Sequence, residues 1–221
     1  MGSKKPSMNS KKLFMSKKRK GAAFACFLFF GFISYFVITR DTLVFDTVIR
    51  EYIYSHRNDG LTVFFTTVTY LGNWNTISLI CGLFLLIPRV RSSFGLPLSA
   101  AALLASLIQK ALKVSFHRAR PDLALHLINQ GGYSFPSGHS FSVLIFYGMM
   151  IFLCRRNLKN KTAANLITIL LSCLILLIGI SRIYLGVHYP TDVLGGWSMG
   201  LCVLLVFLSG LDFLGNRKRY L

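Results

Sequence analysis

Residues 165–183 read NLITILLSCLILLIGISRI, and no charged side chain interrupts this stretch before Arg182. A helix that crosses the hydrocarbon core of a bilayer needs roughly 20 mostly apolar residues, so the stretch predicts a membrane-spanning helix. Five more apolar runs occur, at about 21–39, 62–87, 95–115, 138–154 and 190–214. Because no repeat or Pro/Ser-rich linker separates the runs, they predict an all-α integral membrane protein, one bundle of six transmembrane helices over residues 21–214.

The net charge of +18 is distributed in a way that indicates topology. Basic side chains fill a tail at 1–20, loops at 89–91 and 155–161, and a tail at 215–221. These segments alternate with the span ends that carry six of the seven acids, as expected for six helices with both termini in the cytoplasm. We therefore expect a multi-pass plasma-membrane protein whose tails attract anionic lipid headgroups rather than nucleic acid. Nothing in the sequence points to an obligate protein partner.

The segment between the first two predicted spans has its own pattern. Its apolar residues recur at helical spacing: Phe45, Val48, Ile49, Tyr52 and Ile53. Its polar residues take the other side: Asp46, Thr47, Arg50 and Glu51. The pattern predicts an amphipathic helix in the membrane interface. Such a helix could border a lipid entrance, or it could simply pack against the bundle.

Three polar clusters fall at span ends that the topology places outside the cell. They are Lys113-x6-Arg120-Pro121, Pro136-Ser137-Gly138-His139 and Ser181-Arg182-x5-His188-x3-Asp192. They are far apart in sequence, so only the fold can bring them together. Charged residues at membrane depth are costly and usually functional. For the neighbouring Lys110 and Arg118, snorkelling to lipid phosphates is an equally good interpretation.

Two features of these clusters could bind a phosphate monoester or diphosphate: their cations and the start of one predicted helix. Lys113, Arg120 and Arg182 can surround phosphoryl oxygens, on which charge spreads in the transition state. Ser137 and Gly138 begin a predicted helix, whose free N–H groups and dipole favour an anion. We expect these five residues to bind the phosphate.

The two histidines of the clusters have separate predicted tasks. Asp192 follows His188 by four residues, so its carboxylate can fix the tautomer of that ring and leave the other nitrogen free to attack phosphorus. His139 would donate a proton to the leaving oxygen. Taken singly, Asp192 could be a helix cap and His139 a buried structural histidine. Together with three cations at one face, they favour catalysis.

The three clusters resemble, residue for residue, the signature of the type 2 phosphatidic acid phosphatase superfamily of membrane lipid phosphate phosphatases. The resemblance implies a six-helix membrane fold, no metal or other cofactor, His188 as the phosphorylated nucleophile and His139 as the general acid. Within the family, the small size and the PSGH sequence look like bacterial phosphatidylglycerophosphate phosphatases. The expected substrates are phosphatidylglycerophosphate, undecaprenyl diphosphate or phosphatidic acid.

Two other functions remain open from the residues alone. A transporter or binding protein could hold a lipid phosphate with the same cations without cleaving it, but then the histidines and Asp192 would have no task. A metal-dependent hydrolase could use four ligands, namely His117, His139, His188 and Asp192. No helix motif with metal-ligand spacing supports that second alternative.

Overall fold

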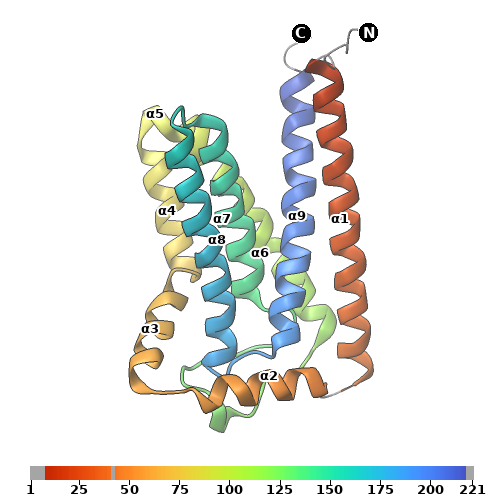
Figure 1. Cartoon of the computed structure of the whole chain (residues 1–221), viewed down its shortest axis with the longest axis vertical. Coiled ribbons are helices and arrows are strands. Elements are labelled where there is room, and N and C mark those ends of the chain that lie inside the picture. The colour runs from red at the N-terminus through yellow and green to blue at the C-terminus, as the bar shows by residue number, and fades with distance from the viewer. Residues whose placement is uncertain (1–7, 41–42, 218–221) are drawn as a thin grey trace, which may run out of the picture.

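The computed structural model describes the backbone of residues 8–40 and 43–217, and the side chains of 17–40 and 43–212. Five helices of this part are long and apolar enough to cross a membrane. They are α1 (Met8–Thr39), α6 (Leu96–Phe116), α7 (Gly138–Asn157), α8 (Lys161–Tyr184) and α9 (Pro190–Arg217). Figure 1 shows them running roughly side by side. The protein is therefore an all-helical, multi-pass membrane protein.

The predicted second span, 62–87, is not a continuous helix. The chain forms α3 (Asp59–Tyr70) and α4 (Trp74–Leu86), with a break at 71–73. Helices of 12 and 13 residues are each too short to cross the hydrocarbon core alone. The expectation of six continuous spans thus holds for five, and the sixth apolar run is divided. A short α5 (Pro88–Val90) and a π-helical turn η1 (Arg91–Gly95) then lead into α6.

Side chains of other helices stabilise the break between α3 and α4. A Cβ atom at Gly72 would lie 2.9 Å from Ile178 and 3.0 Å from His139, so only glycine allows this approach without displacing its neighbours. The hydroxyl of Tyr147 donates to the carbonyl of Leu71 at 2.8 Å. That bond satisfies a backbone acceptor beside the break, as a membrane interior requires.

Helix α1 begins within the predicted basic tail, so the backbone of residues 8–20 continues the first span instead of forming a separate segment. Residues 1–7 and 218–221 of the two predicted tails lie outside the described residues. α1 packs along α9 (Figure 1). In the second half of α1, the ring of Phe30 stacks on that of Phe135, which lies just before α7, with ring centroids 5.6 Å apart.

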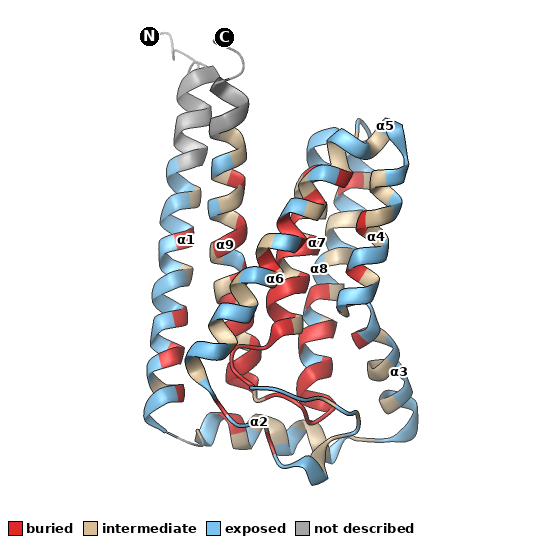
Figure 2. Cartoon of the chain, turned by 180° about the vertical axis from the view of Figure 1, so that it is seen from behind, coloured by how far each residue is buried: buried red, intermediate tan, exposed pale blue. Residues whose placement is uncertain are grey.

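The core is centred on α7, which packs against α6, α8 and α9. Figure 2 shows buried residues concentrated on α7 and on the lower parts of α8 and α9, while α1 is mostly exposed. Many exposed side chains of the outer helices are large and apolar, including Phe32, Leu107 and Leu170. Apolar surfaces of this extent suit contact with lipid.

The predicted interfacial helix is present as α2 (Val44–Ser55), which lies across the end of the bundle opposite the start of α1 (Figure 1). Val44, Val48 and Tyr52 point outward, as a helix in the interface requires. Asp46, which the pattern assigned to the polar side, is 0% exposed and pairs with Arg118 inside the bundle.

Candidate active site

The three predicted clusters meet at the α2 end of the bundle. Arg120, in the loop after α6, lies with Nη1 3.1 Å from Nε2 of His188, which links the first cluster to the third. The backbone N–H of Ser137 donates to the backbone carbonyl of Asp192 at 2.9 Å, which links the second cluster to the third. Residues more than 50 positions apart therefore line one site.

The contacts of His188 determine its tautomer. A guanidinium can only donate, so the bond from Arg120 requires a lone pair on Nε2 of His188. The proton of the neutral ring then lies on Nδ1, which is 3.3 Å from Oδ2 of Asp192. The same carboxylate oxygen accepts the hydroxyl of Ser134 and the N–H of Tyr189. Asp192 is thus fixed by several donors and holds the Nδ1–H tautomer of His188.

Burial keeps His188 neutral. The ring is 1% exposed, and its burial lowers the pKa of His188 to about 3, although the hydrogen bond and negative charge of Asp192 act in the opposite direction. Burial also lowers the pKa of Arg120, and the charge of Asp192 partly opposes the shift. At neutral pH the site therefore presents an unprotonated Nε2 beside a guanidinium.

The three predicted phosphate-binding cations reach the same loop. Lys113 Nζ donates to the carbonyl of Tyr133 at 2.9 Å. Arg120 donates to carbonyls of the same stretch, those of Gly131, Gly132 and Tyr133. Arg182, which is 1% exposed, donates to Gln130 Oε1 at 2.7 Å, and its Nε has no protein partner. Neutral loop oxygens hold these cations, and phosphate oxygens could replace them.

Ser137 and Gly138 stand at the start of α7, as predicted. The hydroxyl of Ser137 caps the helix by accepting the N–H of Ser140 at 3.4 Å. A Cβ atom at Gly138 would lie 2.1 Å from the side-chain amide of Gln109 on α6, so a larger residue here would displace the end of that side chain. The first N–H groups of α7 remain the predicted anion-binding feature at this position.

His139, one residue further along α7, faces the break between α3 and α4. Its Nε2 lies 2.7 Å from Oδ1 of Asn73. Because an amide oxygen only accepts, Nε2 carries the proton, and Nδ1 is the nitrogen that can gain or lose one. Nearby, at the end of α3, Thr69 accepts a hydrogen bond from Arg182 at 2.8 Å. The broken span therefore contributes to the site through Asn73 and Thr69.

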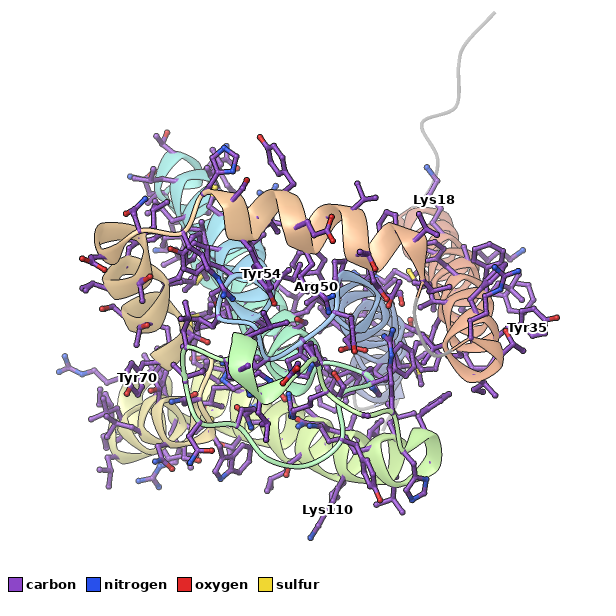
Figure 3. All side chains as sticks on the ribbon, turned by 90° about the horizontal axis from the view of Figure 1, so that it is seen from below. Lys18, Tyr35, Arg50, Tyr54, Tyr70 and Lys110 are labelled. Atoms are coloured by element: carbon purple, nitrogen blue, oxygen red, sulfur yellow. The ribbon has the colours of Figure 1, made fainter. Side chains whose placement is uncertain are left out.

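The sequence left the roles of Arg118 and Lys110 open, and the structure separates them. Arg118 is 8% exposed and forms ion pairs with Asp46 at 2.8 Å and Asp192 at 2.7 Å, so snorkelling is the wrong interpretation for it. Burial acts to lower the pKa of Arg118, but the two carboxylates outweigh it and raise that pKa. Lys110 points away from the bundle (Figure 3).

Several residues of the site were missed by sequence reasoning: Asp46, Thr69, Asn73, Arg118, Gln130, Ser134 and Thr191. Two of them had a signal in the sequence: Arg118 is a charge at membrane depth, and Asn73 follows a glycine, a combination that is common in turns. The metal-ligand alternative is not supported by the geometry. Within the described residues, no three His, Cys, Asp or Glu side chains are grouped to hold an ion.

Comparisons with known proteins show the family to which the chain belongs. The family model described as the PAP2 superfamily matches residues 94–214, more than half of the chain. A crystal structure of a transmembrane PAP2-type phosphatidylglycerolphosphate phosphatase from Bacillus subtilis superposes with a TM-score of 0.76 at 30% identity, covering 86% of this chain and 95% of that one. The crystal structure of Aquifex aeolicus LpxE has a TM-score of 0.61 at 27% identity, over 76% of this chain and 99% of the other.

Curated relatives match over shorter stretches. Phosphatidylglycerophosphatase B of Bacillus subtilis (strain 168) is 40% identical over 110 residues, 48% of this chain and 52% of the relative. The putative undecaprenyl-diphosphatase YbjG of Escherichia coli (strain K12) is 41% identical over 68 residues, 31% of this chain and 30% of the relative. The matches therefore span about half or less of these relatives' length.

Proposed function

Since the chain belongs to the PAP2 superfamily, we propose that it is a metal-independent lipid phosphate phosphatase that works through a phosphohistidine at His188. The observation that carries the proposal is the fixed tautomer of His188. Asp192 holds Nδ1–H, and Arg120 Nη1 lies 3.1 Å from the lone pair on Nε2. A nucleophile for phosphorus and a cation for its oxygens are thus side by side.

In the first step, Arg120 transfers its hydrogen bond from Nε2 of His188 to a phosphoryl oxygen. The freed lone pair of Nε2 attacks phosphorus, and the bond to the lipid oxygen breaks. The ring becomes cationic as the N–P bond forms, and the carboxylate of Asp192 stabilises that charge through Nδ1–H. Lys113, Arg120 and Arg182 take up the negative charge on the phosphoryl oxygens, together with the hydroxyl of Ser137 and the backbone N–H of Gly138 at the start of α7. The oxygens would replace Gln130 and the loop carbonyls as partners of these cations.

His139 serves as the acid and then as the base. The acid is the doubly protonated ring, which the negative charge of the bound phosphate favours. Its Nδ1 proton moves to the departing lipid oxygen, which leaves as an alcohol or as a lipid monophosphate, and the ring is left neutral. A water then gives its proton to Nδ1, attacks the phosphohistidine and releases inorganic phosphate. Asn73 keeps the Nε2 proton in place throughout, because its oxygen cannot take that proton.

The proposed substrate is a membrane lipid with a phosphate or diphosphate headgroup. Phosphatidylglycerophosphate is suggested by the relatives of Bacillus subtilis, and undecaprenyl diphosphate by the match to YbjG. Phosphatidic acid is a third candidate. The apolar outer surface of the bundle lets the acyl or prenyl chain stay in the bilayer while the headgroup enters from the α2 end.

The direct test is phosphate release by purified protein in detergent with EDTA, over a panel of these lipids. Wild type should release inorganic phosphate and His188→Ala should not, while His56→Ala, a change at an exposed histidine, should match wild type. Binding of the lipids without release would favour the transporter or binding-protein alternative instead. Activity that depends on added metal would contradict the proposed mechanism.

We also propose that the site faces outward, because the basic loops lie at the other ends of the helices. Leu123, in the loop after α6, is 77% exposed and suits a cysteine label. In a background without the native cysteines, Leu123→Cys should react with an impermeant thiol reagent on intact cells. Labelling only after permeabilisation would reverse the orientation.

A further inference from the structure

The charged cluster behind Asp192 includes a residue from the interfacial helix. Asp46 on α2 accepts the Arg118 Nη2 at 2.8 Å, the Thr191 hydroxyl at 2.7 Å and the Thr191 N–H at 2.8 Å. It is 0% exposed, although Val44 and Val48 beside it on the same helix are among the exposed apolar residues. A buried carboxylate on an otherwise surface-lying helix is costly unless it is paired, and here it is fully paired.

Arg118 joins Asp46 to the carboxylate that orients His188. Its Nη1 donates to Asp192 Oδ1 at 2.7 Å and to the Thr191 hydroxyl at 2.9 Å. Its guanidinium carbon lies 4.1 Å above the ring centroid of Tyr189. Every charged contact of Arg118 is thus with a carboxylate, whereas Arg120 directs its guanidinium to His188 and the loop carbonyls. Arg118 therefore lies behind Asp192 and not among the phosphate-binding cations.

The charges of this cluster match the charge that the reaction creates. Two carboxylates and one guanidinium sum to one negative charge in a site closed to water. When neutral His188 forms the N–P bond, its ring gains one positive charge, which the cluster balances. Without Asp46, Arg118 would neutralise Asp192 and weaken its hold on His188. Without Arg118, two buried carboxylates would repel each other, and one would be driven to take up a proton.

We propose that Asp46 and Arg118 are positioning residues of this enzyme, which hold Asp192 against His188 and keep the cluster at one negative charge; this rests on the proposed phosphohistidine mechanism. The assignment makes α2 part of the catalytic apparatus. The helix that faces the membrane interface with its apolar side supplies, from its inner side, a charge needed for turnover. That is a more specific role than packing against the bundle.

The kinetic test uses Asp46→Asn, Arg118→Gln, Arg118→Lys and the double variant Asp46→Asn/Arg118→Gln. Asp46→Asn should lower kcat about 10- to 100-fold with little change in KM, by analogy with the losses found when residues that orient metal ligands are changed. Arg118→Gln should lose more, and Arg118→Lys should recover part of the loss. The double variant returns the cluster to one negative charge, so its loss should be smaller than the product of the two single losses.

Two control variants separate positioning from general destabilisation. Arg57→Gln removes another partly buried arginine, which donates to the carbonyl of Tyr184 at 2.9 and 2.6 Å and forms no ion pair within the described part of the chain. Asp122→Asn alters a carboxylate that accepts the Ala124 N–H at 3.0 Å outside the cluster. Both should keep the wild-type kcat. Unchanged kcat in Asp46→Asn, a change in KM alone, or losses that simply multiply in the double variant would overturn the proposal.

A spectroscopic readout keeps this inference separate from the proposed function. In protein with ¹⁵N-labelled histidine, the Nδ1 signal of His188, assigned with His188→Gln, reports its tautomer and its bond to Asp192. Asp46→Asn should shift that signal towards a weaker hydrogen bond, and the two control variants should not. A wild type that releases no phosphate would overturn the proposed function alone. An unshifted His188 signal in Asp46→Asn would overturn the positioning role whatever the activity.

Discussion

His188 and His139 are held in different ways on the same site. His188 is 1% exposed and has both nitrogens occupied, one by a carboxylate that is itself fixed by Ser134, Tyr189 and Arg118. His139 is half-buried and has one nitrogen on the neutral amide of Asn73. A nucleophile needs one invariant tautomer, which charged partners enforce. A proton donor must change its protonation state, so a neutral partner on only one nitrogen suits it.

The largest loss of activity should come from changes at His188 and Asp192, the histidine and the carboxylate that holds it. His188→Ala should abolish turnover, because it removes the nitrogen that attacks phosphorus in the proposed mechanism. Rapid quenching of wild type during turnover should trap acid-labile, base-stable phosphate on His188. Asp192→Asn should lose somewhat less, towards the roughly 10⁴-fold known for a wrong tautomer in a serine-protease triad. Label on Ser137, or in the His188→Ala protein, would refute the assignment.

The next largest loss of activity should come from His139, the histidine held by the amide of Asn73, and its size should depend on the leaving group. A basic alkoxide must be protonated as it departs, so His139→Ala should lower kcat/KM for phosphatidic acid by about 10²–10⁴-fold. The loss should be visibly smaller for p-nitrophenyl phosphate, whose phenolate is a weak base. Arg182→Ala should affect both substrates alike, since Arg182 holds the phosphoryl group common to them. Equal losses for His139→Ala on the two would indicate that His139 binds phosphate instead.

A smaller loss of the same kind should follow from removing the amide. Asn73→Ala leaves His139 without its 2.7 Å partner, and a net hydrogen-bond contribution of about 1 kcal/mol corresponds to roughly a fivefold loss. The loss should be larger on phosphatidic acid than on the aryl phosphate. Asn160→Ala provides the control, because Asn160 likewise precedes a helix but caps α8 by accepting the Ala163 N–H. A loss independent of the leaving group would make Asn73 merely structural.

The smallest expected effect is on stability rather than rate. The pKa of His188 is lowered by burial to about 3, from an ordinary value of 6.5. Between these values the unfolded chain binds a proton at His188 that the folded chain does not, so the free energy of unfolding decreases as the pH falls. In detergent, Tm should therefore drop less steeply from pH 7 to pH 4 in His188→Gln than in wild type. His56→Gln, at an exposed ring, should retain the wild-type slope.

The sequence predicted the contact between His188 and Asp192, but it did not predict the contact between His139 and Asn73. The pair His188 and Asp192 lies four residues apart on one helix start, so its contact follows from local geometry. The hydrogen bond between His139 and Asn73 joins residues 66 positions apart and exists only because a span breaks beside α7. The apolar pattern of 62–87 fits a continuous helix as well as a divided one. The division follows from packing against Tyr147 and Ile178, which the pattern does not contain.

Charge counting also could not predict that Asp46 and Arg118 form an ion pair. The positive-inside rule correctly marked Arg118 as unusual, but it contains no information on partners. Periodicity along α2 assigned Asp46 to the polar side without indicating that this side covers the site. The contacts that bury both residues come from Thr191 and Asp192, more than 70 positions away. Such contacts depend on tertiary packing and not on spacing.

The division of the second apolar run also bears on how the protein is made. Residues 62–87 contain no charged side chain, so the nascent segment is apolar enough to enter the bilayer as one helix. The groups that stabilise the break, Tyr147 on α7 and Ile178 on α8, are synthesised later. We therefore expect the helix to divide only when those helices arrive during assembly. Asn73 would reach His139 at that last stage, so a partly inserted chain cannot yet act on the lipids around it.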